Sequence, residues 1–345
     1  MAIKPVKEVA REAFKQLYKY QSGELTPVKT GRKALDSVFG GLLPQDIVVI
    51  AGGSGMGKSM ELQRLKNYIM DIENNKNAEN YVWLDNSLEM RLLSNIIRDL
   101  NKNLEKSKKK IITEEFTRQE KQLVKNYYEQ ITDGRFFIDE EATEAKVFEQ
   151  RTRTFLEEHK ESEVVFISID HIALQKSEAG EKKGAIDSTI EAVNRMKKEF
   201  PNAIWLILSQ LNRNILGRIK DKDIMAMPNR SDLYNSDTMF HIADYLYVTH
   251  NAYRLGINEF SRVNCRQYDY LSEHFSDEPD KKGKVSFDTL GKMFYITLKA
   301  READVVFEDI HIEDIDIPNL EKYQEQKSII GEIDEPDFGD NNLSF

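Results

Sequence analysis

The chain has 345 residues, 40% of them hydrophobic, and a formal net charge of −10. This is enough for one large domain or two small ones with a sizeable core. No run of 18 apolar residues occurs, and the N-terminus lacks the apolar segment of a signal peptide, so we expect neither a membrane span nor secretion. The single cysteine, Cys265, excludes an internal disulfide and a cysteine-based metal site, and it favours a cytoplasmic location.

The acidic charge is concentrated near the C-terminus. Residues 305–345 contain 12 Asp and Glu against 2 Lys, so the preceding residues balance at 47 acidic and 47 basic side chains. We therefore expect a neutral globular body followed by an acidic, disordered tail over residues 318–345. Such a tail either keeps the protein soluble or docks on a partner through its terminal Phe345.

An amphipathic helix is predicted over residues 5–20. Its apolar side chains recur at helical spacing and are Val6, Val9, Ala10, Ala13, Leu17 and Tyr20. Gly23 and Pro27 then indicate a linker that ends near residue 30. A lone helix before a linker must cover its apolar stripe, either on its own domain or on a neighbouring subunit, and the sequence leaves both possibilities open.

A phosphate-binding loop comes next, because residues 52–59 fit the pattern G-x-x-x-x-G-K-[ST]. The β-branched run 47–51 before it predicts a buried strand, and residues 60–65 predict a helix. Lys58 would reach the β- and γ-phosphates of ATP, and the Ser59 hydroxyl would ligate Mg²⁺. The loop residues whose backbone would surround the phosphates are Gly52, Gly53, Ser54, Gly55, Met56 and Gly57.

Strands and helices alternate from Gly31 onward, which predicts an α/β fold with a mainly parallel central sheet flanked by helices. A charged helical stretch is expected over roughly residues 90–131, and a polar inserted loop or long hairpin over roughly 251–290. The predicted strands are 47–51, 81–85, 135–138, 164–169, 203–208, 245–248 and 293–299.

Polar side chains follow several predicted strands, at the edge where ligands bind in open parallel sheets. Asp170 follows the strand 164–169 and suits a carboxylate that organises Mg²⁺ through water. Glu89 either polarises the attacking water or is a first-turn residue favoured by the helix dipole, and its spacing does not decide between them. Gln210 either senses the γ-phosphate or caps a turn.

The last predicted strand carries two basic residues at its end. Strict alternation would place Lys299 and Arg301 on the face that also carries Tyr295 and Thr297, opposite Phe294 and its neighbours. Together they would either add positive charge to a phosphoryl-transfer site, often one in another subunit, or form an ordinary solvated face.

In this order, the motifs resemble the C-terminal motor domain of DnaB-type replicative helicases, which are RecA-like ATPases. The resemblance extends from about Val6 to Asp316. The phrases that carry it are Leu35-Asp36…Phe39-Gly40-Gly41-Leu42, the phosphate loop, Ser87-Leu88-Glu89-Met90, Ile167-Ser168-Ile169-Asp170-His171, Leu208-Ser209-Gln210-Leu211-Asn212-Arg213, Ser231-Asp232-Leu233…Ala243-Asp244 and Lys299-Ala300-Arg301.

The resemblance implies roles that the residues alone leave open. It makes Glu89 the group that activates water and Gln210 the γ-phosphate sensor. It makes Lys299 and Arg301 a finger that enters the neighbouring subunit's site. It also implies that the helix 5–20 docks on the next subunit of a hexameric ring around single-stranded DNA. The expected regions are a docking helix and linker (1–30), a motor domain (31–317) and the acidic tail (318–345).

Three departures from the family pattern stand out. Few residues precede the helix 5–20, so the family's N-terminal domain is not expected. Primase recruitment through that domain is then in question, and the short form suggests a phage or mobile-element replicon. The loop after Leu233 usually reads Arg-Glu-Ser-Gly in the family, whereas here residues 234–237 read Tyr-Asn-Ser-Asp. The family's usual tyrosine after the strand-end aspartate is His171 here.

Contacts with DNA are expected from the loops that follow Asp170 and Gln210. Tyr234 can stack on a base, and backbone amides near Asn235 can hold phosphates. Taken singly, each basic side chain there fits a solvated charged loop better, whereas as two clusters at the pore-facing end of such a fold some of them are expected to touch DNA. The basic candidates are Lys176, Lys182, Lys183, Arg213, Arg218, Lys220, Lys222 and Arg230.

The expected function is therefore that of an ATP hydrolase, a ring-forming DNA helicase motor that moves on single-stranded DNA during replication. A primase, a loader or another replisome protein would be its partner. One alternative is a RecA- or KaiC-like ATPase that forms rings or filaments without unwinding DNA. Another is a non-enzymatic scaffold of the same fold, against which the complete set of catalytic residue types argues.

Overall fold

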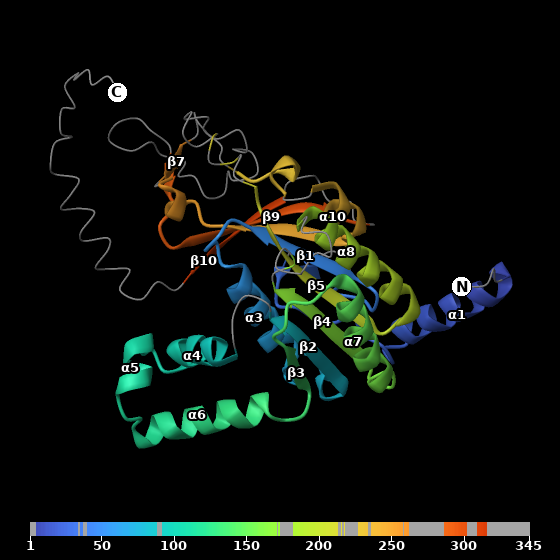
Figure 1. Cartoon of the computed structure of the whole chain (residues 1–345), viewed down its shortest axis with the longest axis horizontal. Helices are drawn as coiled ribbons and strands as arrows, with labels where there is room; N and C mark the ends of the chain where they lie inside the picture. The colour runs from blue at the N-terminus through green and yellow to red at the C-terminus, as the bar shows by residue number, and fades with distance from the viewer. Residues whose placement is uncertain are drawn as a thin grey trace.

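The computed structural model describes residues 5–33, 35–36, 40–87, 92–170, 172, 182–212, 215, 217, 227–233, 236–257, 259–261, 286–301 and 309–315. Within these residues, eight strands form one sheet in the order β10-β9-β6-β1-β5-β4-β2-β3 (Figure 1). The strands are β1 (Ile47–Gly52), β2 (Tyr81–Ser87), β3 (Phe136–Asp139), β4 (Val164–Asp170), β5 (Ala203–Gln210), β6 (Tyr245–His250), β9 (Lys292–Ala300) and β10 (Asp309–Asp314).

The strands from β6 to β3 in this order run parallel, whereas β9 is antiparallel to β6 and β10 is antiparallel to β9. The predicted mainly parallel sheet is therefore confirmed, and so are all seven predicted strands. The edge strand β10 was not predicted, because its acidic residues were assigned to the charged C-terminal region. Its alternating Ile310 and Ile312, which lie opposite Ile296 and Phe294 of β9, are the signal that identifies it.

Two hydrophobic cores lie on opposite faces of the sheet. Along β1, Ile47, Val49 and Ala51 pack into a first core with α7 (Ala145–Glu158), α8 (Lys182–Glu199) and α10 (Ser236–Ile242). Val48 and Ile50 pack into a second core with α3 (Lys58–Ile69). Burial on both faces explains why β1 is a continuous apolar run rather than an alternating one.

The charged stretch predicted near residues 90–131 is divided into α4 (Leu92–Asn103), α5 (Lys108–Thr113) and α6 (Arg118–Ile131). Ser107 caps α5 by accepting a hydrogen bond from Lys110 N, and Thr117 with Glu120 forms a capping box on α6. Each cap starts a new helix, so the stretch forms three short helices rather than one long helix. The three helices lie together at one side of the domain (Figure 1).

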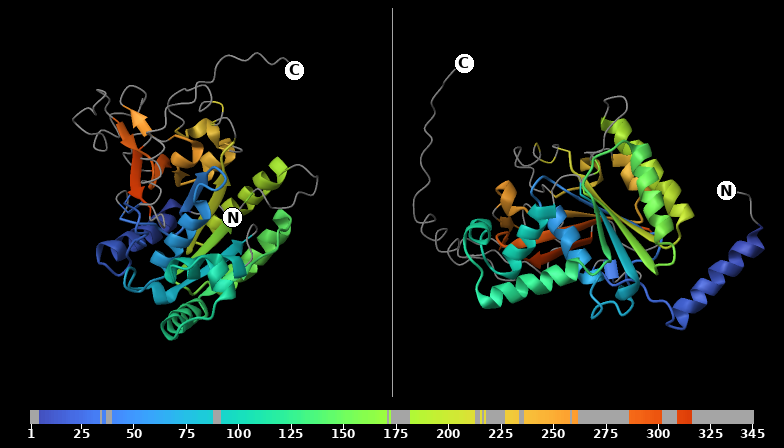
Figure 2. Two further views of the ribbon diagram at one scale, coloured as in Figure 1. Left: turned by 90° about the vertical axis from the view of Figure 1, so that its left-hand side faces the viewer. Right: turned by 60° about the horizontal axis from the view of Figure 1, so that its bottom comes forward.

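The N-terminal helix α1 (Val6–Gln21) is present as predicted, and it extends away from the rest of the domain in Figure 1 and in the right-hand view of Figure 2. None of its residues is buried: Val6 is 82% exposed and Phe14 is 58% exposed. The linker after it is shorter than expected, because Val28 is buried and exchanges two backbone hydrogen bonds with Leu42. Most of the stripe of α1 is thus not covered by its own domain, although its end at Tyr20 is half-buried.

Short elements complete the described structure. They are the 3-10 helices η1 (Ala78–Asn80), η3 (Arg230–Asp232) and η4 (Tyr253–Leu255), and the antiparallel pair β7 (Glu259–Ser261) and β8 (Ser286–Asp288). The β7–β8 pair agrees with the predicted long hairpin between residues 251 and 290. Among the described residues, no helix combines the length and the apolar character needed to cross a membrane.

Candidate functional site

The phosphate loop, residues 52–59, joins the end of β1 to the first turn of α3. Gly55 (φ +73°) and Gly57 (φ +87°) adopt left-handed backbone conformations that favour glycine, and Gly57 is the N-cap of α3. The loop's N–H groups and the positive end of the α3 dipole are therefore available to an anion at this point. The local sequence, strand then glycines then helix, is sufficient to build this turn.

Lys58 is the first residue of α3, and its side chain folds back over the loop. Its Nζ donates hydrogen bonds to the carbonyl oxygens of Gly52 at 3.0 Å and Gly53 at 2.9 Å. The residue is 8% exposed. The ammonium is thus held against the loop backbone, at the position from which it can reach bound phosphates.

Parallel pairing brings the other predicted catalytic positions to the same edge of the sheet. Gln210, the last residue of β5, lies opposite Gly52 in the β1–β5 register. Asp170 ends β4, is buried, and lies opposite Ser87, the last residue of β2. Glu89 lies outside the described residues, two positions after Ser87. Asp170, Gln210 and the loop therefore meet at the carboxyl edge of the sheet, as the motif order predicts.

A cleft of about 650 Å³ opens beside the phosphate loop, a size typical of sites for ligands such as nucleotides. Gln210 and several loop residues line it. The sequence did not point to the rest of the lining, because those residues come from α3, α4, β9, the segment after β6, the β8–β9 turn and the end of β10, and share no spacing rule. These additional residues are Met60, Arg64, Arg98, Asn251, Tyr253, Arg254, Leu290, Gly291, Met293 and Ile315.

Arg254 ties the tip of the phosphate loop to the segment after β6. Its Nη1 donates to the carbonyl oxygen of Gly55 at 2.6 Å, and its backbone N–H donates to Asn251 Oδ1 at 3.1 Å. A guanidinium therefore stands at the mouth of the cleft, where it adds positive charge beside the loop.

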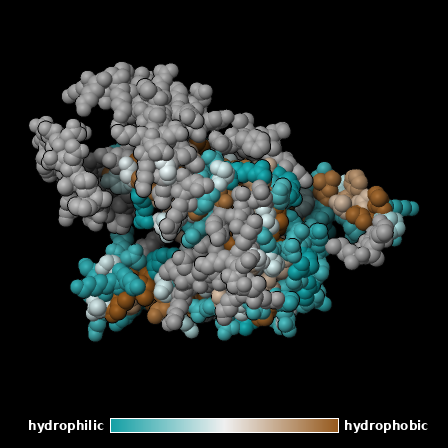
Figure 3. Space-filling view, turned by 45° about the horizontal axis from the view of Figure 1, so that its top comes forward, coloured by the Kyte–Doolittle hydropathy of each residue, from teal (hydrophilic) through white to brown (hydrophobic). Residues whose placement is uncertain are grey.

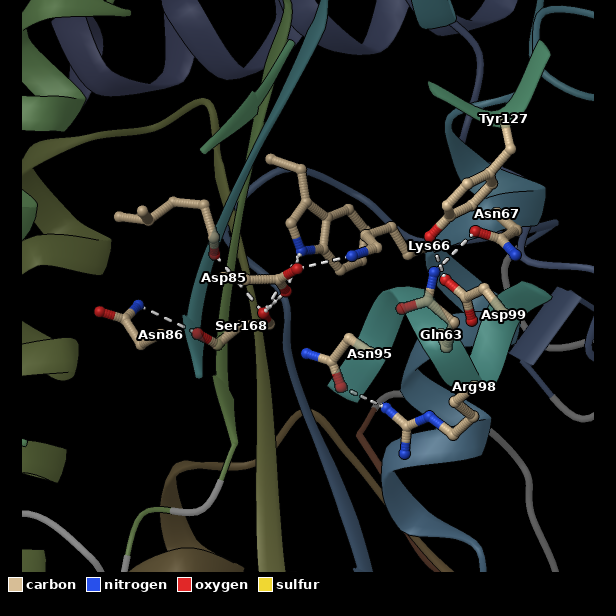
Figure 4. A network of polar contacts seen from close by, with 12 residues as sticks. Gln63, Lys66, Asn67, Asp85, Asn86, Asn95, Arg98, Asp99, Tyr127 and Ser168 are labelled. Carbon is tan, nitrogen blue, oxygen red and sulfur yellow. Dashed lines mark hydrogen bonds and ion pairs between the residues drawn. The ribbon is translucent and has the colours of Figure 1, made fainter. Parts of the chain in front are cut away.

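The end of β2 is anchored to α3 by a polar network (Figure 4). Asp85 accepts hydrogen bonds from Lys66 Nζ at 2.6 Å, from Trp83 Nε1 at 2.7 Å and from the hydroxyl of Ser168. Burial by itself would raise the pKa of Asp85, but Lys66 and these hydrogen bonds outweigh it and hold that pKa below its usual value. Asp85 is therefore a charged anchor for the strand that leads to Glu89.

The basic pair at the end of β9 lies on a different face from the predicted one. The β6–β9 register shifts so that Tyr247 is opposite Thr297, whereas Leu246 is opposite Lys299. Leu246 packs in the first core and Tyr247 in the second, so the irregularity moves Lys299 to the face opposite Thr297. The prediction that strict alternation continues to Lys299 was wrong, although Lys299 and Arg301 still project together.

This pair also lies at the opposite edge of the sheet from the phosphate loop. Arg301 Nη1 bonds to Asp244 Oδ1 at 2.8 Å, and Asp244 Oδ2 accepts from the N–H of Ile47, the first residue of β1. The loop begins at the other end of β1, at Gly52. The structure thus separates the predicted finger from the phosphate loop of the same chain.

Part of the predicted DNA surface can be placed. Arg230 lies in η3, is exposed, and its guanidinium stacks on the Phe240 ring at 4.0 Å. Lys182 and Lys183 begin α8, but their side chains are not among those described. The candidates outside the described residues are Lys176, Arg213, Arg218, Lys220, Lys222, Tyr234 and Asn235, together with His171, Cys265 and the tail 318–345.

The DnaB-like helicase C-terminal domain family matches residues 27–266 of the chain. No curated protein matches it. The solved structure titled "ATPase Domain of G40P" is 18% identical with a TM-score of 0.65, covering 92% of this chain and 100% of that one. A DnaB-like replicative helicase, solved to show its interactions with primase, is 19% identical with a TM-score of 0.59. That match covers 87% of this chain and 62% of the helicase chain.

At these identities the structural matches establish the fold, which is the RecA-like ATPase fold with a mostly parallel sheet. The family match covers more than half of the chain and includes the phosphate loop, Asp170 and Gln210. The chain therefore belongs to the family of DnaB-like helicase C-terminal domains and is an ATP-hydrolysing enzyme.

Proposed function

We propose that the chain is the ATP-driven motor of a ring-forming helicase that moves along single-stranded DNA during replication. One observation carries the proposal: the phosphate loop and the Lys299–Arg301 pair lie at opposite edges of the sheet. A single subunit of this form has half of a phosphoryl-transfer site at each edge. Two subunits joined head to tail complete one site between them.

The separation makes action within one subunit unfavourable. Strand β1 has six residues, and at about 3.3 Å per residue it spans roughly 17 Å from Ile47 to Gly52. Arg301 is bound to Asp244 beside Ile47, so its guanidinium would have to cross the length of β1 to reach its own loop. A neighbour's nucleotide is the better target for this cation, as in enzymes that supply an arginine finger in trans.

Two exposed apolar surfaces support head-to-tail assembly. One is on α1, where Phe14 is 58% and Tyr18 is 64% exposed. The other is on α4–α6, where Ile112 is 60% and Tyr128 is 62% exposed. Figure 3 shows apolar side chains at these two ends of the molecule. Two different surfaces that contact each other between subunits generate a closed ring when the rotation permits, and we propose a hexamer in which α1 docks on the next subunit.

Each site residue would then have a separate role in ATP hydrolysis. The loop amides and Lys58 would hold the phosphates, and Glu89 would orient the attacking water. Ser59 and Asp170 supply oxygen ligands of the kind that Mg²⁺ prefers, and the described residues contain no richer cluster of metal-binding side chains. The metal ion, when bound, would neutralise charge between the β- and γ-phosphates.

We propose that Gln210 passes the state of the γ-phosphate to the loop that follows Leu233. The next residue, Leu211, forms a bridge with Leu233, and Asn212 N donates to Asp232 O at 2.6 Å. Tyr234 follows Leu233 directly in the sequence. We propose that Tyr234, Asn235 and the basic loops after Asp170 and Gln210 contact DNA, and that a primase or loader binds the ring.

The experiment is strand displacement on forked DNA with ATP and Mg²⁺, beside an ATPase assay with and without single-stranded DNA. The expected result is unwinding together with DNA-stimulated hydrolysis, and neither in Lys58→Ala. The loop at 234–237 lacks the family's usual arginine, which leaves open the rival ATPase that assembles without unwinding. Hydrolysis without strand displacement, on forks of either polarity, would select that rival.

A further inference from the structure

One buried carboxylate organises the amino-terminal edge of the sheet. Asp244 follows α10 and is 7% exposed. Its Oδ1 forms an ion pair with Arg301 Nη1 at 2.8 Å, and its Oδ2 accepts from Lys197 Nζ at 2.5 Å and from Ile47 N at 2.9 Å. The carbonyl oxygen of Asp244 also accepts from Arg301 N at 2.7 Å. A single residue thus connects Arg301 to α8 and to the start of β1.

The C-terminal end of α10 holds the same pair from the other side. Lys299 Nζ donates to the carbonyl oxygens of Phe240 at 2.5 Å and His241 at 3.2 Å, and Arg301 Nη2 donates to His241 O at 3.0 Å. The last carbonyl groups of a helix attract cations in this way. Both basic side chains are therefore fixed by short contacts rather than extended into solvent.

The cluster depends on the negative charge of Asp244. Burial lowers the pKa of Lys299, the nearby Arg301 lowers it further, and Asp244 acts in the opposite direction. Lys197, Arg230 and Arg301 surround Lys299 with like charge. Without Asp244 the repulsion between the two finger residues would lose its compensating negative charge, and Arg301 would lose its ion pair.

The anchored Arg301 is nevertheless accessible, since its side chain is 46% exposed. A guanidinium has more N–H donors than its contacts with Asp244 and His241 use. An incoming phosphate can therefore bind Arg301 while Asp244 still holds it. This is the arrangement expected of a preorganised finger, whose geometry is set before the transition state forms.

We propose that Asp244 is a positioning residue for ATP hydrolysis in the neighbouring subunit, which it serves by holding Arg301, beside Lys299, in the orientation that reaches that site. The inference rests on the proposed action of the pair in trans. Because Asp244 also binds Ile47, the finger is fixed to the strand that ends in its own subunit's phosphate loop. The finger of one site and the loop of the next then move as one rigid body.

The test is Asp244→Asn in the full chain, assayed for ATP hydrolysis. Asparagine keeps an oxygen for the Ile47 N–H but loses the charge that binds Arg301. We expect kcat to fall by about tenfold, because Arg301 loses its ion pair with Asp244, with little change in the KM for ATP. Lys197→Gln is the matched control, because it removes another ion pair of the same carboxylate and leaves the Arg301 contact intact. Its kcat should stay well above that of Asp244→Asn.

Subunit mixing separates positioning from a structural role. Lys58→Ala subunits cannot hydrolyse ATP but present an intact finger, so adding them to Asp244→Asn subunits should raise activity per Asp244→Asn subunit severalfold. Arg301→Ala subunits are the reference and should recover in the same way. Gln210→Ala subunits should not recover, since their defect lies beside their own phosphate loop. If Asp244→Asn fails to assemble, Asp244→Glu, which shifts the carboxylate by one methylene, replaces it.

If mixing restores the activity of Arg301→Ala but not that of the Asp244 variant, the inference about Asp244 is wrong, whereas the action of Arg301 in trans is supported. Failure of both, in rings shown by labelled subunits to be mixed, would remove the trans finger itself and the inference with it. A rise in kcat for Asp244→Asn alone would also refute positioning, because it would mean that Asp244 restrains the finger rather than orients it.

Discussion

Replacement of Glu61 tests how much the polar contacts of the first turn of α3, the helix after the phosphate loop, contribute to stability. Glu61 lies in the first turn of α3 and is 1% exposed. Its Oε1 accepts from Arg32 Nε at 2.6 Å and from the Tyr247 hydroxyl at 3.0 Å, and its Oε2 accepts from Arg32 Nη2. Arg32 also pairs with Glu313 of β10 and stacks on Tyr295 at 4.7 Å. The Arg32–Glu61 pair therefore links α3 to β9 and β10.

The cost of breaking this pair follows from its burial. Removing one partner of a buried ion pair costs about 3–5 kcal/mol, and leaving a buried hydroxyl without its acceptor adds about 1 kcal/mol. Glu313 still compensates part of the charge on Arg32, so we expect Glu61→Ala to lose about 3 kcal/mol of unfolding free energy. The double variant Arg32→Met with Glu61→Leu removes both charges and should lose about 1 kcal/mol or less.

Arg32→Met alone makes a prediction about pH. Burial raises the pKa of Glu61 even against the opposing charge of Arg32, so removing Arg32 should raise it further. A carboxyl whose folded pKa lies above its unfolded value contributes stability at low pH, which is lost as the pH rises through the folded pKa. The Arg32→Met variant should therefore lose less stability at about pH 5 than at about pH 8.

The assay is urea unfolding at one fixed protein concentration, because assembly shifts apparent stability by mass action. The unchanged protein, both single variants and the double variant are measured together. A loss below about 1 kcal/mol for Glu61→Ala, or a double variant as unstable as that single one, would refute the reasoning.

Four further outcomes are expected. Lys58→Ala should abolish ATP hydrolysis while circular dichroism stays unchanged; near-normal turnover would contradict the phosphate-loop assignment. Glu89→Gln should keep nucleotide affinity but slow hydrolysis by orders of magnitude, and unchanged turnover would make Glu89 a helix-start residue. Deleting residues 1–22 should raise the concentration needed for assembly in sedimentation experiments, whereas equal assembly would deny α1 a docking role. The acidic tail carries charge of the same sign as phosphate and could compete with DNA for the basic loops, so removing residues 318–345 should tighten DNA binding at low salt, with a gain that shrinks as salt rises; unchanged affinity at low salt would exclude this competition.

The phosphate loop and the sheet could be predicted from sequence because local physics determines them. Glycines between a β-branched run and a helix form the loop wherever the chain places it. Strands such as 164–170 and 203–210 are apolar runs whose ends carry Asp170 and Gln210. Parallel strands share one carboxyl edge, so their terminal side chains must meet there. Family resemblance then supplied the expected roles of residues whose spacing alone was ambiguous, such as Glu89.

Only the tertiary structure decided where the basic pair stands. Alternation along β9 predicts that Lys299 lies on the same face as Thr297. The register shift opposite Leu246 places Lys299 on the other face. The sequence of β9 alone does not reveal this shift, because it depends on how β9 pairs with β6. The same holds for Arg98 and Arg254, which come from separate elements and meet only in the folded cleft. In the sequence, Asp244 is simply the residue that precedes the predicted strand 245–248. Its three partners are distant along the chain, and folding alone brings Ile47, Lys197 and Arg301 to one carboxylate.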